Sequence, residues 1–503
     1  MRQEVVGYTI GEATITSATF ISKITPRVGQ YVVMEYDGRR VLGLIKALVR
    51  GSISLTSDIH DPLVVERLKA LDRGATSYLK GEVRIIGDVR SFELPRTPPP
   101  PGTELLRADR DILARVFGYG ERGIRIGVLL SEPDVPVYVD VNKMVTRHLA
   151  ILAITGAGKS NTVAVIAERI VERGGCVLIF DMHSEYSSAE FSVRVNELAT
   201  RLNPLYMHTS ELLRLLNIDS KAYVQERYFR EALSEARKLV YNSTIQAENF
   251  LKFIRSKLES MLNELGNGRR PKRDRDSILA VLNKIDAFVE RYTGLLDPLT
   301  PPVASQIRTG AVNIVDLGRL DEEMADVVVS HVLRSVLEAR KKFYHSGGRA
   351  GLPFPLLMVL EEAHILAPRD RDTLSKYWIG RIAREGRKFG VGLCLVSQRP
   401  KALDSGALSQ ANNMIILRLV EPSDQRYVQQ ASELLSEDLL EQLSSLNVGE
   451  AVVIGPMVRV PALVKVDRFK GRRLGEDVDV LGEWSRACLK SFSSELDHLR
   501  EGW

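Results

Sequence analysis

The stretch ILAITGAGKSNT, residues Ile151–Thr162, has the composition of a loop that holds phosphate groups. It stands between an apolar run and the helical pattern NTVAVIAERIVER, so the loop would join a buried strand to a helix. Gly156 and Gly158 allow backbone N–H groups to converge on phosphate oxygens beside the positive end of the helix dipole. We expect Lys159 to reach the β- and γ-phosphates of ATP, and the Ser160 hydroxyl to take one Mg²⁺ position. The predicted nucleotide-binding residues are Gly156, Ala157, Gly158, Lys159, Ser160 and Asn161.

Ala153 occupies the place where loops of this kind usually open with a glycine. The position lies at the end of the predicted strand, where a methyl group fits if the local φ is negative. The two glycines nearest the phosphates are retained. A glycine-rich turn without a ligand is the alternative, which the strand, the Lys-Ser pair and the helix together argue against.

The acids that a phosphate-binding loop requires stand in PLLMVLEEAHILAP, residues 355–368. An apolar run leads into Glu361 and Glu362 at the carboxyl end of a predicted buried strand. We expect Glu361 to anchor Mg²⁺ through water and Glu362 to orient the attacking water. Many ATPases have aspartate at the first position, so Glu361 is a departure with a longer side chain. The alternative is that both glutamates simply stabilise a helix N-terminus electrostatically.

Two other strand ends carry polar residues. LIFDMHSEY, residues 178–186, places Asp181, His183 and Glu185 near the pocket, because ligands bind outside the carboxyl ends of parallel strands. Turn formation or orientation of the metal's surroundings fits these three residues better than direct catalysis. Gln398 ends the run VGLCLVSQ, and its amide would sense the γ-phosphate or cap the strand.

A basic cluster follows in GRIAREGRKFGVG, residues 380–392. On a helix, Arg381, Arg384, Arg387 and Lys388 fall on one face, where each like-charged pair costs roughly 0.2–0.5 kcal/mol. A bound anion would offset the repulsion between these charges and so explain the cluster. We expect one of these arginines to reach the ATP of a neighbouring subunit. Such an arginine accelerates phosphoryl transfer by about 10³–10⁵. A solvated basic face is the alternative.

The composition is that of an ordinary globular protein, with 503 residues of which 44% are hydrophobic and 26% charged. No apolar run approaches the roughly 18 residues that cross a bilayer, and the start lacks a signal peptide's apolar stretch. We therefore expect a cytoplasmic protein without a membrane partner. The net charge of +5 permits an anionic partner. The three cysteines, Cys176, Cys394 and Cys488, are too far apart for a CxxC metal cage, and the first two are expected in the core.

The chain divides into segments of different pattern. Strand-like runs around Asp37-Gly38 predict a small β barrel, and PRTPPPPG (95–102) predicts a stiff boundary after it. From residue 124, six apolar runs alternate with helical patterns and predict an α/β core with a parallel sheet. The predicted segments are a β barrel (1–95), a linker (96–123), the core (124–205 and 301–470), a helical insertion (206–300) and a C-terminal helical tail (471–503).

These motifs together resemble the HerA family, within the HerA/FtsK superfamily of hexameric DNA-translocating ATPases. The resemblance covers nearly the whole chain, including AITGAGKSNT, FDMHSEY, VLEEAHILAP and IAREGRKFGVGLCLVSQRP. It implies a RecA-like P-loop core with an N-terminal HAS barrel, and a homohexameric ring that hydrolyses ATP between subunits. It also implies that the ring pulls double-stranded DNA through its centre and works with a NurA-like nuclease in DNA end processing for recombinational repair.

The resemblance further implies roles for single residues. Arg384 and Arg387 are both arginine-finger candidates, while Arg147 and Lys465 would contact the nucleotide. The basic loop GNGRRPKRDRD (266–276) is a candidate DNA contact, with a solvated outer loop as the alternative. An ATP-gated DNA clamp or nuclease-loading scaffold, without processive motor activity, is the alternative function.

Overall fold

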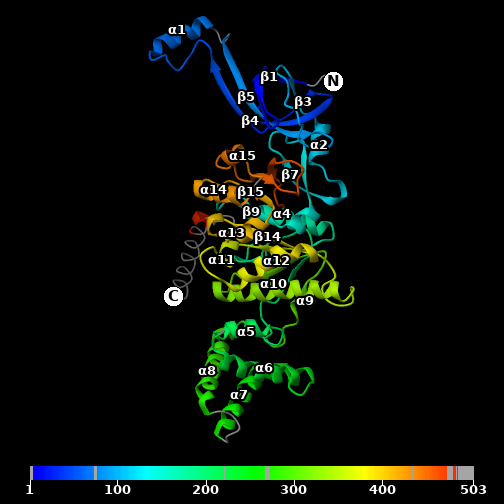
Figure 1. Ribbon diagram of the computed structural model, residues 1–503, viewed down its shortest axis with the longest axis vertical. Coiled ribbons are helices and arrows are strands. Elements are labelled where there is room, and N and C mark those ends of the chain that lie inside the picture. Colours follow the sequence, from blue (N-terminus) through cyan, green and yellow to red (C-terminus); the bar gives the residue numbers. More distant parts are fainter. Residues whose placement is uncertain are drawn as a thin grey trace, which may run out of the picture.

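The computed structural model describes residues 4–72, 76–219, 221–266, 272–432, 434–472, 480–482 and 484. The molecule is elongated, with a barrel at one end, an α/β core in the middle and a helical lobe at the other end (Figure 1). The predicted tail at 471–503 lies mostly outside the described residues, as do Cys488 and the middle of the basic loop. No helix in the described part of the chain has the length and apolar character needed to span a membrane.

The N-terminal end is a closed barrel of antiparallel strands in the order β1-β2-β5-β4-β3-β6. Asp37 and Gly38, with φ of 49° and 70°, form the predicted hairpin turn between β3 and β4. The strands are β1 (Val5–Ala13), β2 (Ser17–Ser22), β3 (Tyr31–Tyr36), β4 (Arg39–Ser52), β5 (Ser77–Asp88) and β6 (Glu104–Arg107).

Strand β6 lies inside segment 96–123, which we expected to be a linker. It pairs with both β1 and β3 and so closes the barrel. The preceding prolines do not end the domain, because their carbonyl groups still accept hydrogen bonds: Thr9 Oγ1 donates to the Pro100 carbonyl at 2.7 Å. Helix α2 (Arg110–Phe117) follows at once, with Asp109 as its N-cap. The expected boundary at residue 95 is therefore wrong, and the barrel extends to Arg107.

Strands β4 and β5 extend beyond the barrel as a long hairpin that carries α1 (Pro62–Asp72) near its tip (Figure 1). Helix α1 has no buried residue. Leu63 and Leu71 on the helix are 59% and 81% exposed, and Ile53, the residue after β4, is 75% exposed. The hairpin and its helix therefore form an arm with apolar side chains in solvent.

The core is an 11-stranded sheet in the order β11-β12-β10-β13-β14-β9-β15-β16-β17-β7-β8. All six predicted apolar runs are parallel neighbours in it, and the strands β16, β17, β7 and β8 continue it in antiparallel pairing. The predicted α/β class with a parallel-rich P-loop core and an N-terminal barrel is thus confirmed. The strands are β7 (Gly123–Leu129), β8 (Pro136–Asp140), β9 (Leu149–Leu152), β10 (Cys176–Asp181), β11 (Val195–Glu197), β12 (Ala311–Asp316), β13 (Leu356–Leu360), β14 (Val391–Ser397), β15 (Asn413–Ile416), β16 (Glu450–Ile454) and β17 (Ala462–Val466).

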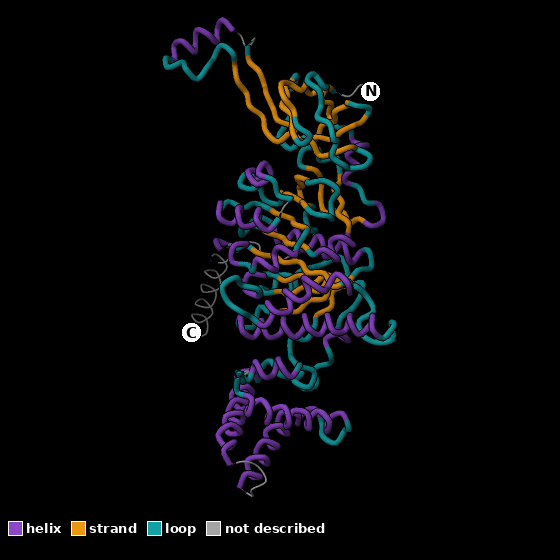
Figure 2. Tube along the Cα trace, in the orientation of Figure 1, coloured by secondary structure: helices purple, strands orange, loops and turns teal. Residues whose placement is uncertain are grey.

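Helices cover both faces of this sheet (Figure 2). Cys176 and Cys394 are buried within it as free thiols, as expected. The core helices are η1 (Gly120–Arg122), α3 (Val141–Arg147), α4 (Lys159–Glu172), α10 (Glu322–His345), α11 (Ala363–Leu366), α12 (Leu374–Phe389), η4 (Pro400–Ala402), α13 (Ser405–Gln410), α14 (Pro422–Ala431) and α15 (Glu437–Gln442).

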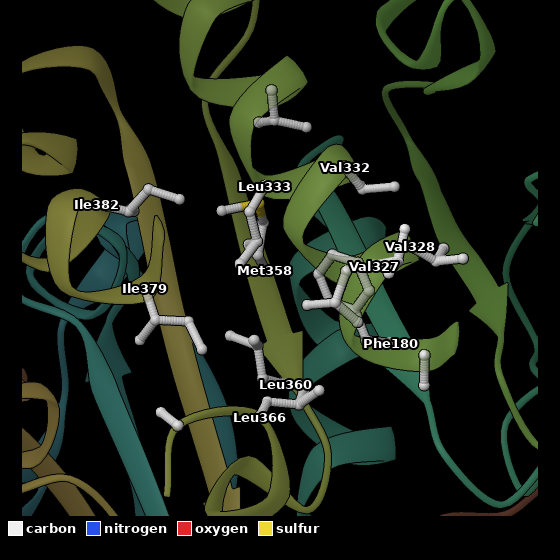
Figure 3. Close-up of a cluster of buried hydrophobic side chains, with 14 of the residues drawn as sticks. Phe180, Val327, Val328, Val332, Leu333, Met358, Leu360, Leu366, Ile379 and Ile382 are labelled. Carbon is white, nitrogen blue, oxygen red and sulfur yellow. The ribbon is translucent and has the colours of Figure 1, made fainter. Parts of the chain in front are cut away.

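Apolar side chains from α10, α12, β10 and β13 interdigitate on one face of the sheet (Figure 3). A fully buried aliphatic or aromatic side chain of this kind contributes about 1.5–3 kcal/mol relative to an exposed one. All five residues of β13 are buried, and its apolar run ends at Leu360. Glu361 and Glu362 are therefore the first residues to leave the sheet, at its carboxyl edge.

The helical lobe is inserted between β11 and β12 and lies at the end of the molecule opposite the barrel (Figure 2). A buried ion network joins it to the core: Arg334 of α10 donates to Glu211 at 2.6 Å, and His331 lies 3.5 Å from the same carboxylate. Although burial opposes it, the contacts with His331 and Arg334 lower the pKa of Glu211 to about 2. The helices of this region are α5 (Thr209–Leu215), α6 (Tyr223–Tyr241), η2 (Ala247–Asn249), α7 (Phe250–Gly266), η3 (Lys272–Asp274) and α8 (Arg275–Tyr292). The short helix α9 (Val303–Gln306) follows them in the chain and lies against α10 of the core (Figure 1).

Candidate nucleotide site

A cavity of about 620 Å³ lies where the loops after β9, β10, β13 and β14 meet. Its volume falls within the ~300–1,000 Å³ of typical small-ligand sites. The β17 segment closes the cavity from the antiparallel part of the sheet. The predicted residues that line it are Gly156, Gly158, Lys159, Ser160, Asn161, Glu361, Glu362, Gln398 and Lys465.

The phosphate loop turns through two glycines in the left-handed region, Gly156 with φ 76° and Gly158 with φ 108°. Gly158 is the N-cap of α4, so the first N–H groups of this long helix face the loop. The backbone φ of Ala153 is not positive, and its side chain is fully buried. Its methyl group therefore fits as expected.

Ala157 and Asn161 make contacts with the C-terminal part of the chain. Ala157 is 3% exposed, and its carbonyl accepts a hydrogen bond from the Gly449 N–H at 2.9 Å. The Asn161 side chain donates to the Asp467 carbonyl at 2.8 Å and accepts from the Phe469 N–H at 2.9 Å. Both residues thus join the phosphate loop to the C-terminal strands. Ala157 is absent from the cavity wall, and the polar atoms of Asn161 are already occupied.

Lys159 lies in the cavity wall opposite a cluster of acids. Burial lowers the pKa of Lys159, while the negative charges of Glu362, Glu361 and Glu185 act in the opposite direction. An anionic phosphate would supply a further negative partner for this partly desolvated ammonium group. The arrangement suits a lysine that binds phosphate.

The two glutamates are almost fully buried, at 4% exposed for Glu361 and 6% for Glu362. The Oε2 atom of each has no hydrogen-bond partner among the described residues. Burial, together with the charges of Glu185 and Asp181, raises the pKa of Glu361 well above its usual range. Burial also raises the pKa of Glu362, against the effect of Lys159 and His183.

The backbone of Glu362 is strained, with φ 45° and ψ 46°. A non-glycine residue in this left-handed region costs on the order of 1–3 kcal/mol and persists only where the surroundings impose it. The turn directs the chain abruptly from β13 into the short helix α11. Such outliers concentrate at functional sites, which supports a role for Glu362 that does not depend on helix capping.

The site fits a divalent cation. Buried carboxylate oxygens without donors, in a region where acids raise each other's pKa, are stabilised by added positive charge. Among the described residues, no group of three or more His, Cys, Asp or Glu side chains is placed to hold a metal ion alone. Mg²⁺ would therefore need phosphate oxygens as well as Ser160 and Glu361, which is its usual coordination in nucleotide sites.

The loop after β10 is organised by Asp181. Its carboxylate accepts hydrogen bonds from the N–H groups of Glu185 at 3.0 Å, Tyr186 at 2.9 Å and Ser187 at 2.9 Å. Of the alternatives for Asp181, turn formation is the one that these contacts support. His183 and Glu185 are held in the cavity wall as a result.

Gln398 is tied to the phosphate loop. Thr155 Oγ1 donates to Gln398 Oε1 at 2.5 Å, across the boundary between β9 and β14. The strand order places β14 between the phosphate-loop strand β9 and the acid-bearing strand β13. Gln398 is thus more than a strand cap, because its amide contacts the loop that would hold the phosphates.

Lys465 lies on β17 in the cavity wall, and its ammonium group donates to the Val448 carbonyl at 2.7 Å. Sequence reasoning missed its neighbours in the wall: Thr155, Val448, Gly449, Val466 and Arg468. A usable signal was the glycine that opens GEAVVI, since this residue, Gly449, has φ 76° and approaches Gly158. Arg468 had no comparable signal, because it stands in an irregular polar segment.

The three predicted arginines lie outside this cavity. Arg147 ends α3 just before β9, so it stands at the opposite end of that strand from the phosphate loop. Arg384 and Arg387 are exposed on α12, which contacts α3. Arg147 therefore lies away from the cavity of its own subunit.

The basic face of α12 is less uniform than its sequence suggests. Arg381 donates to Glu385 at 3.2 Å and lies over the Trp378 ring, and Lys341 of α10 contacts the same Glu385. Arg384 and Arg387 have no recorded hydrogen bond or ion pair within the described residues. The unpaired charge of this cluster thus lies on Arg384, Arg387 and the exposed Lys388, and not on Arg381.

The site has three parts that together define a P-loop ATPase. They are a glycine-rich loop before a helix N-terminus, a buried acid pair at the end of a second parallel strand, and a glutamine at the end of the strand between them. The family described as "Helicase HerA, central domain" matches residues 124–336, and the HAS barrel domain matches residues 6–91. Curated relatives extend the match to nearly the full length. The "DNA double-strand break repair helicase HerA" of Saccharolobus solfataricus is 43% identical over 96% of both chains, and that of Pyrococcus furiosus is 34% identical over 98% of this chain and 100% of the relative.

The chain therefore belongs to the HerA helicase family. Among solved structures, the bacterial conjugative coupling protein TrwB is 14% identical with a TM-score of 0.49, covering 72% of this chain and 92% of TrwB. VirB4 of Thermoanaerobacter pseudethanolicus is 16% identical with the same TM-score, covering 70% of this chain and 98% of VirB4.

Proposed function

We propose that this chain forms a homohexameric ring that hydrolyses ATP to translocate along or unwind double-stranded DNA. We further propose that it acts with a NurA-like nuclease in DNA end processing for recombinational repair. The relatives named as double-strand break repair helicases support the repair role. The observation that supports a ring is that the two exposed, unpaired arginines on α12 lie outside the nucleotide cavity of their own subunit.

Within one subunit, the chain's own residues would divide the chemistry. The phosphate loop binds and orients the nucleotide through its N–H groups and Lys159. Ser160 and Glu361 would hold Mg²⁺, which when bound neutralises charge on the β- and γ-phosphate oxygens. Glu362 accepts a hydrogen bond from a water molecule and orients it toward the γ-phosphate. Gln398, held by Thr155, contacts the γ-phosphate and distinguishes ATP from ADP.

A neighbouring subunit would complete the site with an arginine. Arg384 or Arg387 stabilises the charge that develops in the transition state, so hydrolysis depends on the relative position of two subunits. Arg147, on the adjacent α3, belongs to the same surface and would contact the neighbour's nucleotide. Lysines and arginines at the centre of the ring would grip DNA phosphates without sequence preference, with strong salt dependence.

The alternative function is an ATP-gated DNA clamp or nuclease-loading scaffold without processive motor activity. DNA-stimulated multiple turnover separates the two, because a clamp needs nucleotide only for assembly. Lys159→Ala and Glu362→Gln should abolish hydrolysis and DNA movement together. Strand displacement that persists in either variant would count against the motor. Native mass measurement with an ATP analogue and duplex DNA tests the ring itself, and a monomer under these conditions would exclude it.

A further inference from the structure

His364 lies in the short helix α11, two residues after the strained Glu362. Its Nδ1 atom is 3.2 Å from Glu362 Oε2 and 3.3 Å from the hydroxyl oxygen of Ser397. Ser397 is the last residue of β14, is fully buried, and accepts a hydrogen bond from the Arg399 N–H at 3.1 Å. One imidazole therefore contacts both the glutamate and the strand end that carries Gln398.

That strand end is itself fixed to the phosphate loop. The Ser397 carbonyl accepts a hydrogen bond from the Ala153 N–H at 3.2 Å, and Gln398 is held by Thr155. The Glu362 carboxylate, in contrast, has an oxygen without a hydrogen-bond partner among the described residues. This oxygen, Oε2, is the one that lies 3.2 Å from His364 Nδ1. His183 is farther away, 3.9 Å from the other oxygen, and its side chain is 54% exposed.

We propose that His364 is a positioning residue, which sets the carboxylate of Glu362 against the end of β14 so that Glu362 and Gln398 address the same γ-phosphate. The proposal rests on the proposed role of Glu362 as the residue that orients water. The distances carry it, because Nδ1 lies 3.2 Å from Glu362 Oε2, which has no hydrogen-bond partner among the described residues, and 3.3 Å from the Ser397 hydroxyl, which the Arg399 N–H anchors.

The charge state of His364 agrees with a positioning role. Burial, and then the positive charges of Arg399 and Lys159, lower the pKa of His364 to about 4. The imidazole is therefore neutral at neutral pH, with one N–H donor and one acceptor nitrogen. With its proton on Nδ1, the neutral imidazole can direct this one N–H toward the Glu362 carboxylate or share it with the Ser397 hydroxyl oxygen, and it forms no ion pair that would lower the basicity of Glu362.

The test uses the full-length chain with duplex DNA in a steady-state ATPase assay. His364→Phe keeps a ring and removes both nitrogens, whereas His364→Asn retains a polar atom near the position of Nδ1. Loss of such a supporting contact typically costs about 10–100-fold in activity. We expect His364→Phe to lower kcat by at least ~10-fold with KM for ATP within ~3-fold of the wild type, and His364→Asn to recover most of kcat.

Ser397→Ala removes the other end of the contact with a small change in volume. We expect it to lower kcat less than His364→Phe, and the double variant to be no slower than His364→Phe alone, since residues in one network are not additive. His60→Gln, in the exposed arm, is the matched histidine control and should keep the wild-type kcat.

Three results would overturn the inference. They are a wild-type kcat in His364→Phe, equal losses in the Phe and Asn variants with KM rising in parallel, or fully additive effects of His364 and Ser397. Glu362→Gln is measured in the same assay to separate the two levels of the argument. If Glu362→Gln keeps hydrolysing ATP, the proposed role of Glu362 fails; if it is inactive while His364→Phe is normal, only the positioning role fails.

Discussion

The hydroxyl of Thr155 donates a hydrogen bond to the side-chain oxygen of Gln398, linking the phosphate loop to the strand next to it. Through this bond, the loop that would hold the γ-phosphate orients the amide group of Gln398. If the loop moves when nucleotide binds, Gln398 at the end of β14 should therefore move with it. Glu362 contacts the same strand end through His364 and Ser397.

Removing the Gln398 amide should slow hydrolysis more than it weakens binding. A lost donor to developing charge costs about 10²–10³ in kcat in favourable cases, and we expect at least ~10-fold for Gln398→Ala. Thr155→Val should show a smaller loss, because it frees the amide without deleting it. Thr155→Ser, which keeps the hydroxyl, is the matched control. A Gln398→Ala enzyme with normal kcat would remove Gln398 from the proposed mechanism.

Glu362→Gln should bind ATP and fail to hydrolyse it, because the neutral amide can accept a hydrogen bond from water but is not basic enough to take its proton. A general base contributes about 10²–10⁴ to rate, and single-turnover measurement should reveal a loss of this size. Glu248→Gln, an exposed residue of the helical lobe, serves as the control. Weak ATP binding together with the loss of turnover would indicate instead that the substitution damages the pocket.

Glu361 should destabilise the nucleotide-free protein at neutral pH. Its folded-state pKa lies above the ordinary value of 4.5, so its stabilising contribution exists at low pH, where it is protonated, and is lost as pH rises through the folded-state pKa. Glu361→Gln lacks this titration and should be more stable than the wild type at pH 8, with a smaller difference at pH 5. Thermal denaturation at the two pH values measures the effect. An equal or larger gain at pH 5 would contradict the sign.

Arg384→Ala or Arg387→Ala should inactivate the assembled enzyme while leaving its own cavity intact. The loss for the true finger is expected to be about 10³-fold or more. Mixing that variant with inactive Lys159→Ala subunits should restore part of the activity, since each supplies what the other lacks. Arg381→Ala is the matched control on the same helix, because Arg381 is already paired with Glu385 and such pairs contribute only about 0–1 kcal/mol. No recovery on mixing would place the arginine's action within one subunit.

Much of the fold was predictable because its signals are local. The apolar runs of the parallel strands are continuous and end in polar residues, so the carboxyl edge that carries Glu361 and Gln398 could be located from the sequence. Strand β6 was missed for the opposite reason. It has only four residues, follows a proline run, and is defined by pairing with β1 and β3 far away in the chain.

The site shows the same division. Gly156, Lys159 and Glu362 stand in contiguous motifs, and the structure brings them to one cavity. The contacts of Asn161 with Asp467 and Phe469 depend on the antiparallel strands that return to the phosphate loop, which no local pattern encodes. The strain at Glu362 was also invisible, because a glutamate before Ala363 carries no sign of a left-handed backbone.

The last strand of the barrel in chain order, β6, closes it, and this decides where the chain can be cut into separate fragments. A fragment cut after residue 95 would expose the edges of β1 and β3, and open strand edges invite self-association. The remaining piece would begin with a strand that has lost both neighbours. A barrel fragment that is produced separately should therefore keep β6 paired with β1 and β3. This requires a cut after Arg107 and before α2.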